Sequence, residues 1–243
     1  MPKNSAPTVS VQNFRMKFGD KEVIKDLSFE VKKGETFGLL GSNGCGKTTT
    51  IRTLLGLYEP TEGALLINGK KFAPEDGFVV GYLPEDRGLY RKETVLDVMV
   101  YFGRLKGQRN PRQWSLDYLK RVGLEQKAGE KIERLSSGQQ QKVQLGITIM
   151  NDPKLLILDE PTKGFDPVNR RLLMNIIDEV RRKGATVLMI THYMDEVERL
   201  CDRAILLKDG VTKAYGTIGE IKKSFNGKSL DEIFVKIYGE QDV

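Results

Sequence analysis

Apolar and polar residues alternate along the first part of the chain, from Thr8 to Val31, on both sides of Gly19-Asp20. Strict alternation is typical of strands with one buried face, and a Gly-Asp pair between two such runs indicates a turn. Residues 63–69 predict a further short strand, which ends in the hairpin signal Asn68-Gly69. Together these segments predict one small antiparallel sheet.

The rest of the chain combines short, continuously apolar runs with amphipathic helices. Such runs are typical of parallel strands that are covered on both faces. They are Thr36–Leu40, Leu155–Leu158 and Thr186–Ile190. Helices are predicted where apolar residues recur at helical spacing. These stripes are Ile51, Leu54 and Leu55; Val95, Val98, Met99, Phe102 and Leu105; Leu173, Ile176, Ile177 and Val180; and Met194, Val197 and Leu200. Residues 93–150 look helical throughout, and Asp209-Gly210 predicts a closing hairpin. The pattern predicts an α/β fold.

Composition adds few constraints. The chain of 243 residues is 39% hydrophobic and 30% charged, which is ordinary for a soluble globular protein. It has no apolar run near the roughly 18–20 residues that span a bilayer and no signal peptide in residues 1–9, so we expect it to stay in the cytoplasm. Cys45 and Cys201 are expected to be reduced thiols. The formal charge of +6 fits attraction to nucleotides, anionic lipids or nucleic acid and selects none of them.

A glycine-rich loop lies between the first apolar run and the helix after it, the context that the pattern G-x-x-x-x-G-K-[ST] requires. Its residues are Gly41, Ser42, Asn43, Gly44, Cys45, Gly46, Lys47 and Thr48. Glycines let backbone N–H groups fold around phosphate, and the helix adds the positive end of its dipole. We predict that Lys47 reaches the β and γ phosphates, that Thr48 binds Mg²⁺ and that Cys45 needs only to be small. The alternative is an ordinary glycine turn that caps a helix.

Two carboxylates, Asp159 and Glu160, end the second apolar run. An open α/β sheet usually places its ligand at the carboxyl ends of its strands. We expect Asp159 to hold Mg²⁺, directly or through water, and Glu160 to polarise the attacking water as a general base. A polar exit turn is the structural alternative.

A second anion site is predicted where small hydroxyl residues open a helix. These residues are Ser136, Ser137, Gly138 and Gln139. The structural alternative is a serine N-cap.

The phosphate loop, the segment 135–139, the acidic strand end and the single downstream histidine occur in the order seen in ATP-binding cassette ATPases, and the chain resembles this family over nearly its whole length. The resemblance implies ATP and Mg²⁺ as cofactors. It also implies that 135–139 is the signature motif, which closes over ATP held by the opposite subunit of a head-to-tail dimer. The implied fold is a single domain with a P-loop NTPase (RecA-like) core. Its parts are the core with a small antiparallel β-subdomain (8–83 and 152–215), an inserted helical subdomain (84–151) and a C-terminal helical tail (216–243).

The resemblance assigns further residues one at a time. Phe18 falls where the family stacks an aromatic ring on adenine, with Val23 beside it, although a core phenylalanine is the alternative. Thr49 joins the nucleotide-binding set. Asp166 looks like the segment that crosses the dimer interface, and it could equally cap its helix. His192 stands where the family contacts the γ-phosphate, so it joins Glu160 and Lys47 as a catalytic candidate.

Two positions depart from the family pattern. Ser137 replaces the usual glycine of the signature and adds a side chain there. Glu85 stands where most members carry a glutamine that links Mg²⁺ to the membrane partner. A carboxylate can also hold Mg²⁺, so Glu85 is a metal candidate that brings a charge. In this respect the chain resembles exporter-type subunits of the ABC-2, drug and antibiotic efflux kind.

The predicted function is that of an ATPase subunit that drives separate membrane-spanning permease chains from the inner face of the cell membrane. It would act as a homodimer or heterodimer, and no nucleic acid partner is expected. One alternative is a cassette ATPase outside transport. Another is a simple P-loop kinase or GTPase, but the guanine-reading Asn/Thr-Lys-x-Asp is missing, because Phe165 stands where its Asp should be.

Overall fold

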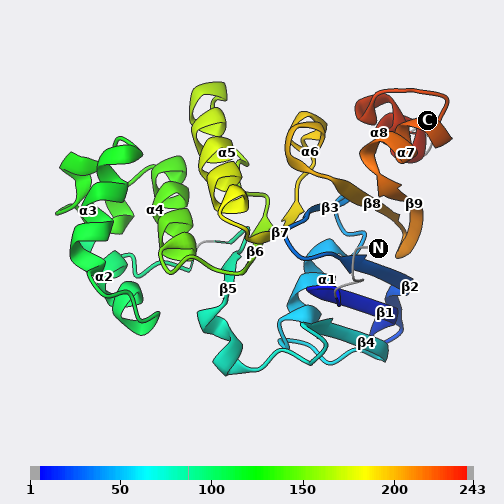
Figure 1. Cartoon of the computed structure of the whole chain (residues 1–243), viewed down its shortest axis with the longest axis horizontal. Helices are drawn as coiled ribbons and strands as arrows, with labels where there is room; N and C mark the ends of the chain where they lie inside the picture. The colour runs from blue at the N-terminus through cyan, green and yellow to red at the C-terminus, as the bar shows by residue number, and fades with distance from the viewer. Residues whose placement is uncertain (1–5, 87, 240–243) are drawn as a thin grey trace. The chain divides into compact units, whose positions relative to one another are not determined.

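The computed structural model describes residues 6–86 and 88–239. Their contacts divide them into two compact units (Figure 1). The first unit contains both ends of the described chain, 6–74 and 186–239, and the second lies within 75–185. The second unit therefore extends beyond the predicted helical segment 84–151 on both sides.

Antiparallel strands form one part of the first unit. They are β1 (Val9–Phe18), β2 (Lys21–Val31) and β4 (Glu62–Ile67). β1 lies between the other two, with Val9 opposite Val31 on one side and Ile67 on the other. The predicted antiparallel sheet is thus confirmed. Its alternation is interrupted at Asn13, where a positive φ of 48° accompanies a register shift after Val11, as in a β-bulge.

Mainly parallel strands form the other part of the first unit. They are β3 (Thr36–Gly41), β7 (Thr186–Ile190), β8 (Arg203–Lys208) and β9 (Val211–Thr217). β3 is buried along its whole length between β7 and β8, to which it is parallel. β8 and β9 form the predicted hairpin around Asp209-Gly210, which both have positive φ. The strand order within this unit is β4-β1-β2-β9-β8-β3-β7.

Helices follow the strands of the first unit. They are α1 (Lys47–Leu54), α6 (Met194–Leu200), α7 (Ile218–Ser224) and α8 (Leu230–Tyr238). α7 and α8 form the last part of the described chain (Figure 1). Both begin with a capping box. Ile221, Leu230 and Ile233 bury the apolar faces of these two helices.

The second unit contains a parallel strand pair and a group of helices. Its elements are η1 (Pro74–Phe78) at the boundary, β5 (Val80–Leu83), α2 (Val95–Leu105), α3 (Pro111–Arg121), η2 (Glu125–Lys127), η3 (Ile132–Arg134), α4 (Ser137–Ile149), β6 (Leu155–Asp159) and α5 (Pro167–Arg182). β6 is buried throughout, as predicted, and pairs with β5 in parallel. Gly123 and Gly184 have positive φ just after α3 and α5, where left-handed glycines end helices.

Two expectations need correction. Leu105, predicted at the end of the buried stripe of α2, is 55% exposed. The buried residues of α2 stop at Gly103, and spacing along a helix does not tell where its packing partner ends. The turn at Asn68-Gly69 forms with positive φ at both residues, but only the single bridge between Ile67 and Lys70 closes it, so the described residues 70–79 add no strand that pairs with β4.

Candidate functional site

The glycine-rich loop connects β3 to α1 within the first unit. Gly46 has a φ of 106°, and a Cβ atom there would overlap with the side chain of Ile24, so glycine is required. α1 begins after Gly46 without a side-chain cap, whereas α4 and α5 begin on capping side chains. An uncapped helix start in a glycine-rich loop presents backbone N–H groups and a dipole to an anion. The loop therefore fits a phosphate group.

Lys47 is folded back into this loop. Its Nζ donates to the carbonyl oxygens of Gly41 at 2.7 Å and Ser42 at 2.9 Å, and the residue is only 8% exposed. Carbonyl oxygens satisfy the donors of an ammonium group but carry no formal charge. An incoming phosphate would supply the opposite charge that these partners lack.

Cys45 belongs to the packing of the loop. It is buried, and its sulfur lies where a side chain on Gly41 would have to go. Burial raises the pKa of the Cys45 thiol, which therefore stays protonated at neutral pH. Cys201 is also buried, and both cysteines are free, as predicted.

The other predicted nucleotide contacts of the first unit come from β1, β2, the start of α1 and the turn after β7. Phe18 is 45% exposed and meets the Tyr58 ring edge-on at 5.3 Å, so the alternative of a core phenylalanine is wrong. Val23 is half-buried and borders Gly46. Thr48 and Thr49 occupy the first turn of α1 and are half-buried.

His192 is exposed and directly follows β7 and Thr191. The hydroxyl of Thr191 accepts from the Tyr193 N–H at 3.1 Å and donates to the Glu196 carboxylate at 2.9 Å. These bonds fix the turn on both sides of His192, whose ring centre lies 4.1 Å from that of Tyr193.

The acidic strand end belongs to the second unit. Asp159 ends β6 and is 1% exposed, and Glu160 follows at 8%. Glu160 has a φ of 51°, a left-handed conformation that is uncommon for a residue with a side chain and often marks a functional position. Among residues 6–86 and 88–239, no group of three or more His, Cys, Asp and Glu could hold a metal ion alone. Mg²⁺ commonly takes one or two protein carboxylates and fills its shell with water and phosphate, so the residues present still suit it.

The segment 136–139 starts α4 with a capping box. The Ser136 hydroxyl accepts from the Gln139 N–H at 3.3 Å, and the Gln139 side chain accepts from the Ser136 N–H at 2.9 Å. The serine N-cap that was the structural alternative is therefore present. Gly138 lies against the Phe165 ring, which a Cβ atom would approach to 3.1 Å.

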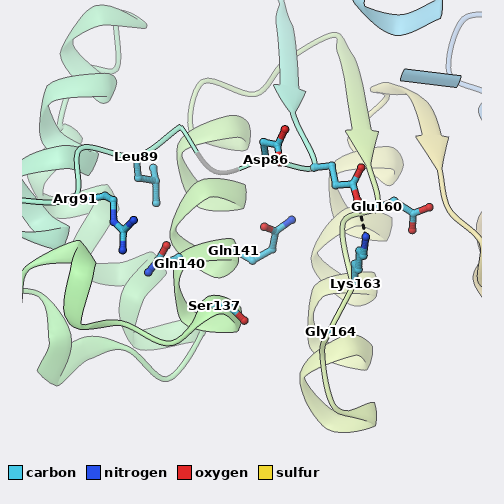
Figure 2. Close-up of a pocket in the computed structure, with 10 residues that line it drawn as sticks. Asp86, Leu89, Arg91, Ser137, Gln140, Gln141, Glu160, Lys163 and Gly164 are labelled. Atoms are coloured by element: carbon cyan, nitrogen blue, oxygen red, sulfur yellow. Dashed lines mark hydrogen bonds and ion pairs between the residues drawn. The ribbon is translucent and has the colours of Figure 1, made fainter. Parts of the chain in front are cut away.

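A pocket of about 580 Å³ in the second unit joins this helix start to the acidic turn. Figure 2 shows Ser137, Gln140 and Gln141 on α4, with Glu160 and Lys163 on the turn after β6. The amide of Gln141 contacts the Pro161 carbonyl at 3.5 Å and so ties α4 to that turn.

Glu85 also lines this pocket and forms an ion pair that sequence reasoning missed. Its carboxylate lies 2.6 Å from the Nζ of Lys163. The two residues are 78 positions apart, so no local pattern connects them. The only sequence signal for this pair was Lys163 itself, which stands shortly after Asp159 and Glu160 and carries a charge opposite to that of Glu85.

Asp166 caps α5. Its carboxylate accepts from the N–H groups of Val168 at 2.9 Å and Asn169 at 3.0 Å, which confirms the capping alternative. Hydrogen bonds from the backbone and then the side chain of Asn169 lower the pKa of Asp166. A role at a dimer interface stays a prediction.

The structure thus gathers the predicted site residues into two sets. The first unit holds Phe18, Val23, the loop 41–49 and His192; the second holds Glu85, 136–139, Asp159, Glu160 and Asp166. No helix among the described residues has the length and apolar character needed to cross a membrane.

Comparison with known proteins agrees with this geometry. A family model described as "ABC transporter" matches residues 24–163, more than half of the chain. An uncharacterized ABC transporter ATP-binding protein of Methanocaldococcus jannaschii is 46% identical over 217 residues, which cover 88% of this chain and 79% of that protein. The Nod factor export ATP-binding protein I of Burkholderia lata is 37% identical over 231 residues, which cover 93% of this chain and 76% of that protein.

A solved structure described as the ATP binding subunit of an ABC transporter matches with a TM-score of 0.85 and 32% identity, covering 94% of this chain and 98% of the other. This match confirms the predicted α/β fold of the P-loop NTPase class. The relatives are transporter subunits, which gives no support to a cassette ATPase outside transport. The chain therefore belongs to the ABC transporter family and is an ATP-binding subunit of such a transporter.

Proposed function

We propose that this subunit binds ATP with Mg²⁺ at the loop 41–48 and hydrolyses the bond between the β and γ phosphates. The observation that carries the proposal is the glycine-rich loop before the uncapped start of α1, where the ammonium of the largely buried Lys47 donates to the carbonyl oxygens of Gly41 and Ser42 and to the sulfur of Cys45, all uncharged groups. Such a loop is suited to an anion that brings its own charge.

Residues of the first unit would bind the nucleotide. Lys47 would exchange the carbonyls of Gly41 and Ser42 for β and γ phosphate oxygens. The exposed ring of Phe18 would stack on adenine, with Val23 beside it. Thr49 would complete the phosphate contacts, and His192 would contact the γ-phosphate from its fixed turn.

Residues of the second unit would carry hydrolysis. Glu160 would orient and polarise the attacking water as a general base, a role that its strained, largely buried position supports. Asp159, Thr48 and Glu85 would hold Mg²⁺. When bound, the metal ion would supply positive charge to the phosphate oxygens.

Two subunits would form the complete site. We propose a head-to-tail dimer, of identical or different chains, in which the segment 136–139 of one subunit closes over ATP on the other. The capping box supports this role because it presents the start of α4 in one fixed conformation. Asp166, at the exposed start of α5, would lie in the segment that crosses the interface. The division into a core, a helical part and a C-terminal tail is proposed with the same boundaries as in the sequence analysis.

Separate membrane permease chains would convert this cycle into transport. We propose that the subunit works at the inner, cytoplasmic face of the membrane through such a partner. The name of the Burkholderia relative, a Nod factor export protein, supports export as the direction.

The Glu160→Gln substitution tests this proposal. We expect it to retain ATP binding, to lower turnover by about 10²–10⁴-fold, the usual contribution of a general base, and to trap a dimer in size-exclusion chromatography with ATP. Glu125→Gln, at an exposed residue outside the pocket, removes the same charge and should behave as wild type. A Glu160 variant that stays monomeric with ATP bound, or that hydrolyses at the wild-type rate, would refute the assignment.

A further inference from the structure

The last described helix, α8, reaches the strand that supports the phosphate loop. Tyr238, at the end of α8, donates its hydroxyl hydrogen to the carbonyl oxygen of Leu207 at 2.6 Å. Leu207 lies in β8 directly beside Gly41, the last residue of β3 and the first of the loop. The C-terminal helix thus contacts the residue on which the loop rests.

The contact between Leu207 and Gly41 leaves no free space. A Cβ atom on Gly41 would lie 2.6 Å from the Leu207 carbonyl oxygen and would overlap with the sulfur of Cys45. The carbonyl oxygen of Gly41 accepts from the Lys47 ammonium at 2.7 Å. A shift of the Leu207 carbonyl would therefore be passed through Gly41 to Lys47, because closely packed atoms transmit displacement.

α8 is held at both ends and can act as a rigid support. At its start, the Leu230 N–H donates to the Glu198 carboxylate at 3.2 Å. At its end, the Lys208 ammonium donates to the Ile237 carbonyl at 2.6 Å, as basic side chains often do at helix ends. The helix also buries Leu230 and Ile233 completely.

The Tyr238 hydroxyl is a permanent donor at physiological pH. Burial raises the pKa of Tyr238, and the neighbouring Cys45 and Asp209 act in the same direction. The phenol therefore keeps its proton.

We propose that Tyr238 is a positioning residue for nucleotide binding, because its hydrogen bond to Leu207 holds Gly41, and through it Lys47, in the conformation that receives phosphate. This inference rests on the proposed ATP site at the loop. It gives α8 a function in nucleotide binding that acts through β8 and the phosphate loop.

The test compares two tyrosines that make the same hydrogen bond. Tyr238→Phe removes only the hydroxyl, and Tyr118→Phe removes a buried hydroxyl that donates to the Lys142 carbonyl at 2.8 Å in the second unit. The affinity for a non-hydrolysable ATP analogue with Mg²⁺ is measured by calorimetry on the full chain. We expect Tyr238→Phe to weaken binding ~3–10-fold, the worth of one hydrogen bond, and Tyr118→Phe to change it less than about twofold. Hydrogen exchange of the amides in 41–48 should accelerate only in Tyr238→Phe.

Three outcomes would overturn the inference: an affinity of Tyr238→Phe within twofold of wild type, unchanged exchange in the loop, or an equal loss in Tyr118→Phe, which would indicate a general effect on stability. Lys47→Met separates this failure from failure of the proposed function. If Lys47→Met weakens binding by about 10–100-fold while Tyr238→Phe does not weaken it, only the role of Tyr238 is wrong. If Lys47→Met binds normally, the ATP site itself is wrong.

Discussion

Replacing Lys47 by methionine is the sharpest test of the phosphate loop. Methionine keeps most of the apolar stem of lysine and removes the ammonium, together with its bonds to the carbonyls of Gly41 and Ser42. In the free subunit the Lys47 residue as a whole is 8% exposed, and its ammonium donates to two carbonyl oxygens in place of water. The substitution therefore removes a desolvated charge from the place where phosphate is expected.

The effect on the affinity for ATP follows because the Lys47 ammonium exchanges its hydrogen-bond partners when ATP binds. A hydrogen bond to a charged group contributes about 1.5–3 kcal/mol, and each 1.4 kcal/mol changes the dissociation constant about tenfold. Since the ammonium gives up two neutral carbonyls to gain charged phosphate oxygens, only part of this energy is a net gain. We expect Lys47→Met to weaken the binding of ATP by about 10–100-fold.

The effect on stability should be small because two terms oppose each other. Burying an ammonium costs several kcal/mol, and two hydrogen bonds from a charged group return about 1.5–3 kcal/mol each. These terms nearly cancel, so we expect the free energy of unfolding to change by less than about 1 kcal/mol. For a chain of this size that is a shift in Tm of less than about 4 °C.

Titration calorimetry with a non-hydrolysable ATP analogue and scanning calorimetry measure the two quantities. Lys223→Met is the matched control, because it removes one positive charge from an exposed position on α7, away from the loop. Wild-type affinity in Lys47→Met would contradict the phosphate-loop assignment. An equal loss in Lys223→Met would mean that long-range charge, and not contact with the phosphates, determines binding.

Two further predictions concern helix packing and a surface ion pair. Gly146→Ala places a Cβ atom in overlap with the edge of the Tyr118 ring. Overpacking of about 1–3 kcal/mol should outweigh the gain of about 1 kcal/mol in helix propensity, and thermal melts should show a net loss. Gly219→Ala, in α7 with nothing within 4 Å, should gain up to about 1 kcal/mol, and the reverse order would contradict the packing argument. The side chains of Glu85 and Lys163 are 41% and 58% exposed, so their ion pair should contribute little to stability. A double-mutant cycle with Glu85→Gln and Lys163→Met should give a coupling in unfolding free energy below about 1 kcal/mol. This coupling should shrink in high salt. A larger coupling that does not depend on salt would show that the pair is more deeply buried than the structure indicates.

The elements of the fold were predictable where the signal is local. The buried strands β3, β6 and β7 are continuous apolar runs, and Asp209-Gly210 specifies its own turn through two positive φ angles. The start of α4 was predictable for the same reason, since Ser136 and Gln139 are three positions apart and satisfy each other's backbone N–H groups. Interactions between residues this close in sequence form in much the same way whatever surrounds them.

Packing could not be predicted in this way. The stripe of α2 included Leu105, yet burial ends at Gly103, because the extent of a buried face depends on where the neighbouring elements end. Phe18 fitted both a core residue and a nucleotide contact, and only its exposure of 45% rejected the core. An apolar residue at the end of a strand has the same local sequence signal in either environment.

The sequence by itself determined the order of the motifs, the type of most elements and the family, because each of these depends on residues that are near neighbours or on a fixed order along the chain. The tertiary structure alone decided which distant residues meet. Glu85 finds Lys163 across 78 positions and Tyr238 finds Leu207 across 31. These pairs form because strands and helices pack in one arrangement, which brings together side chains that no local pattern connects.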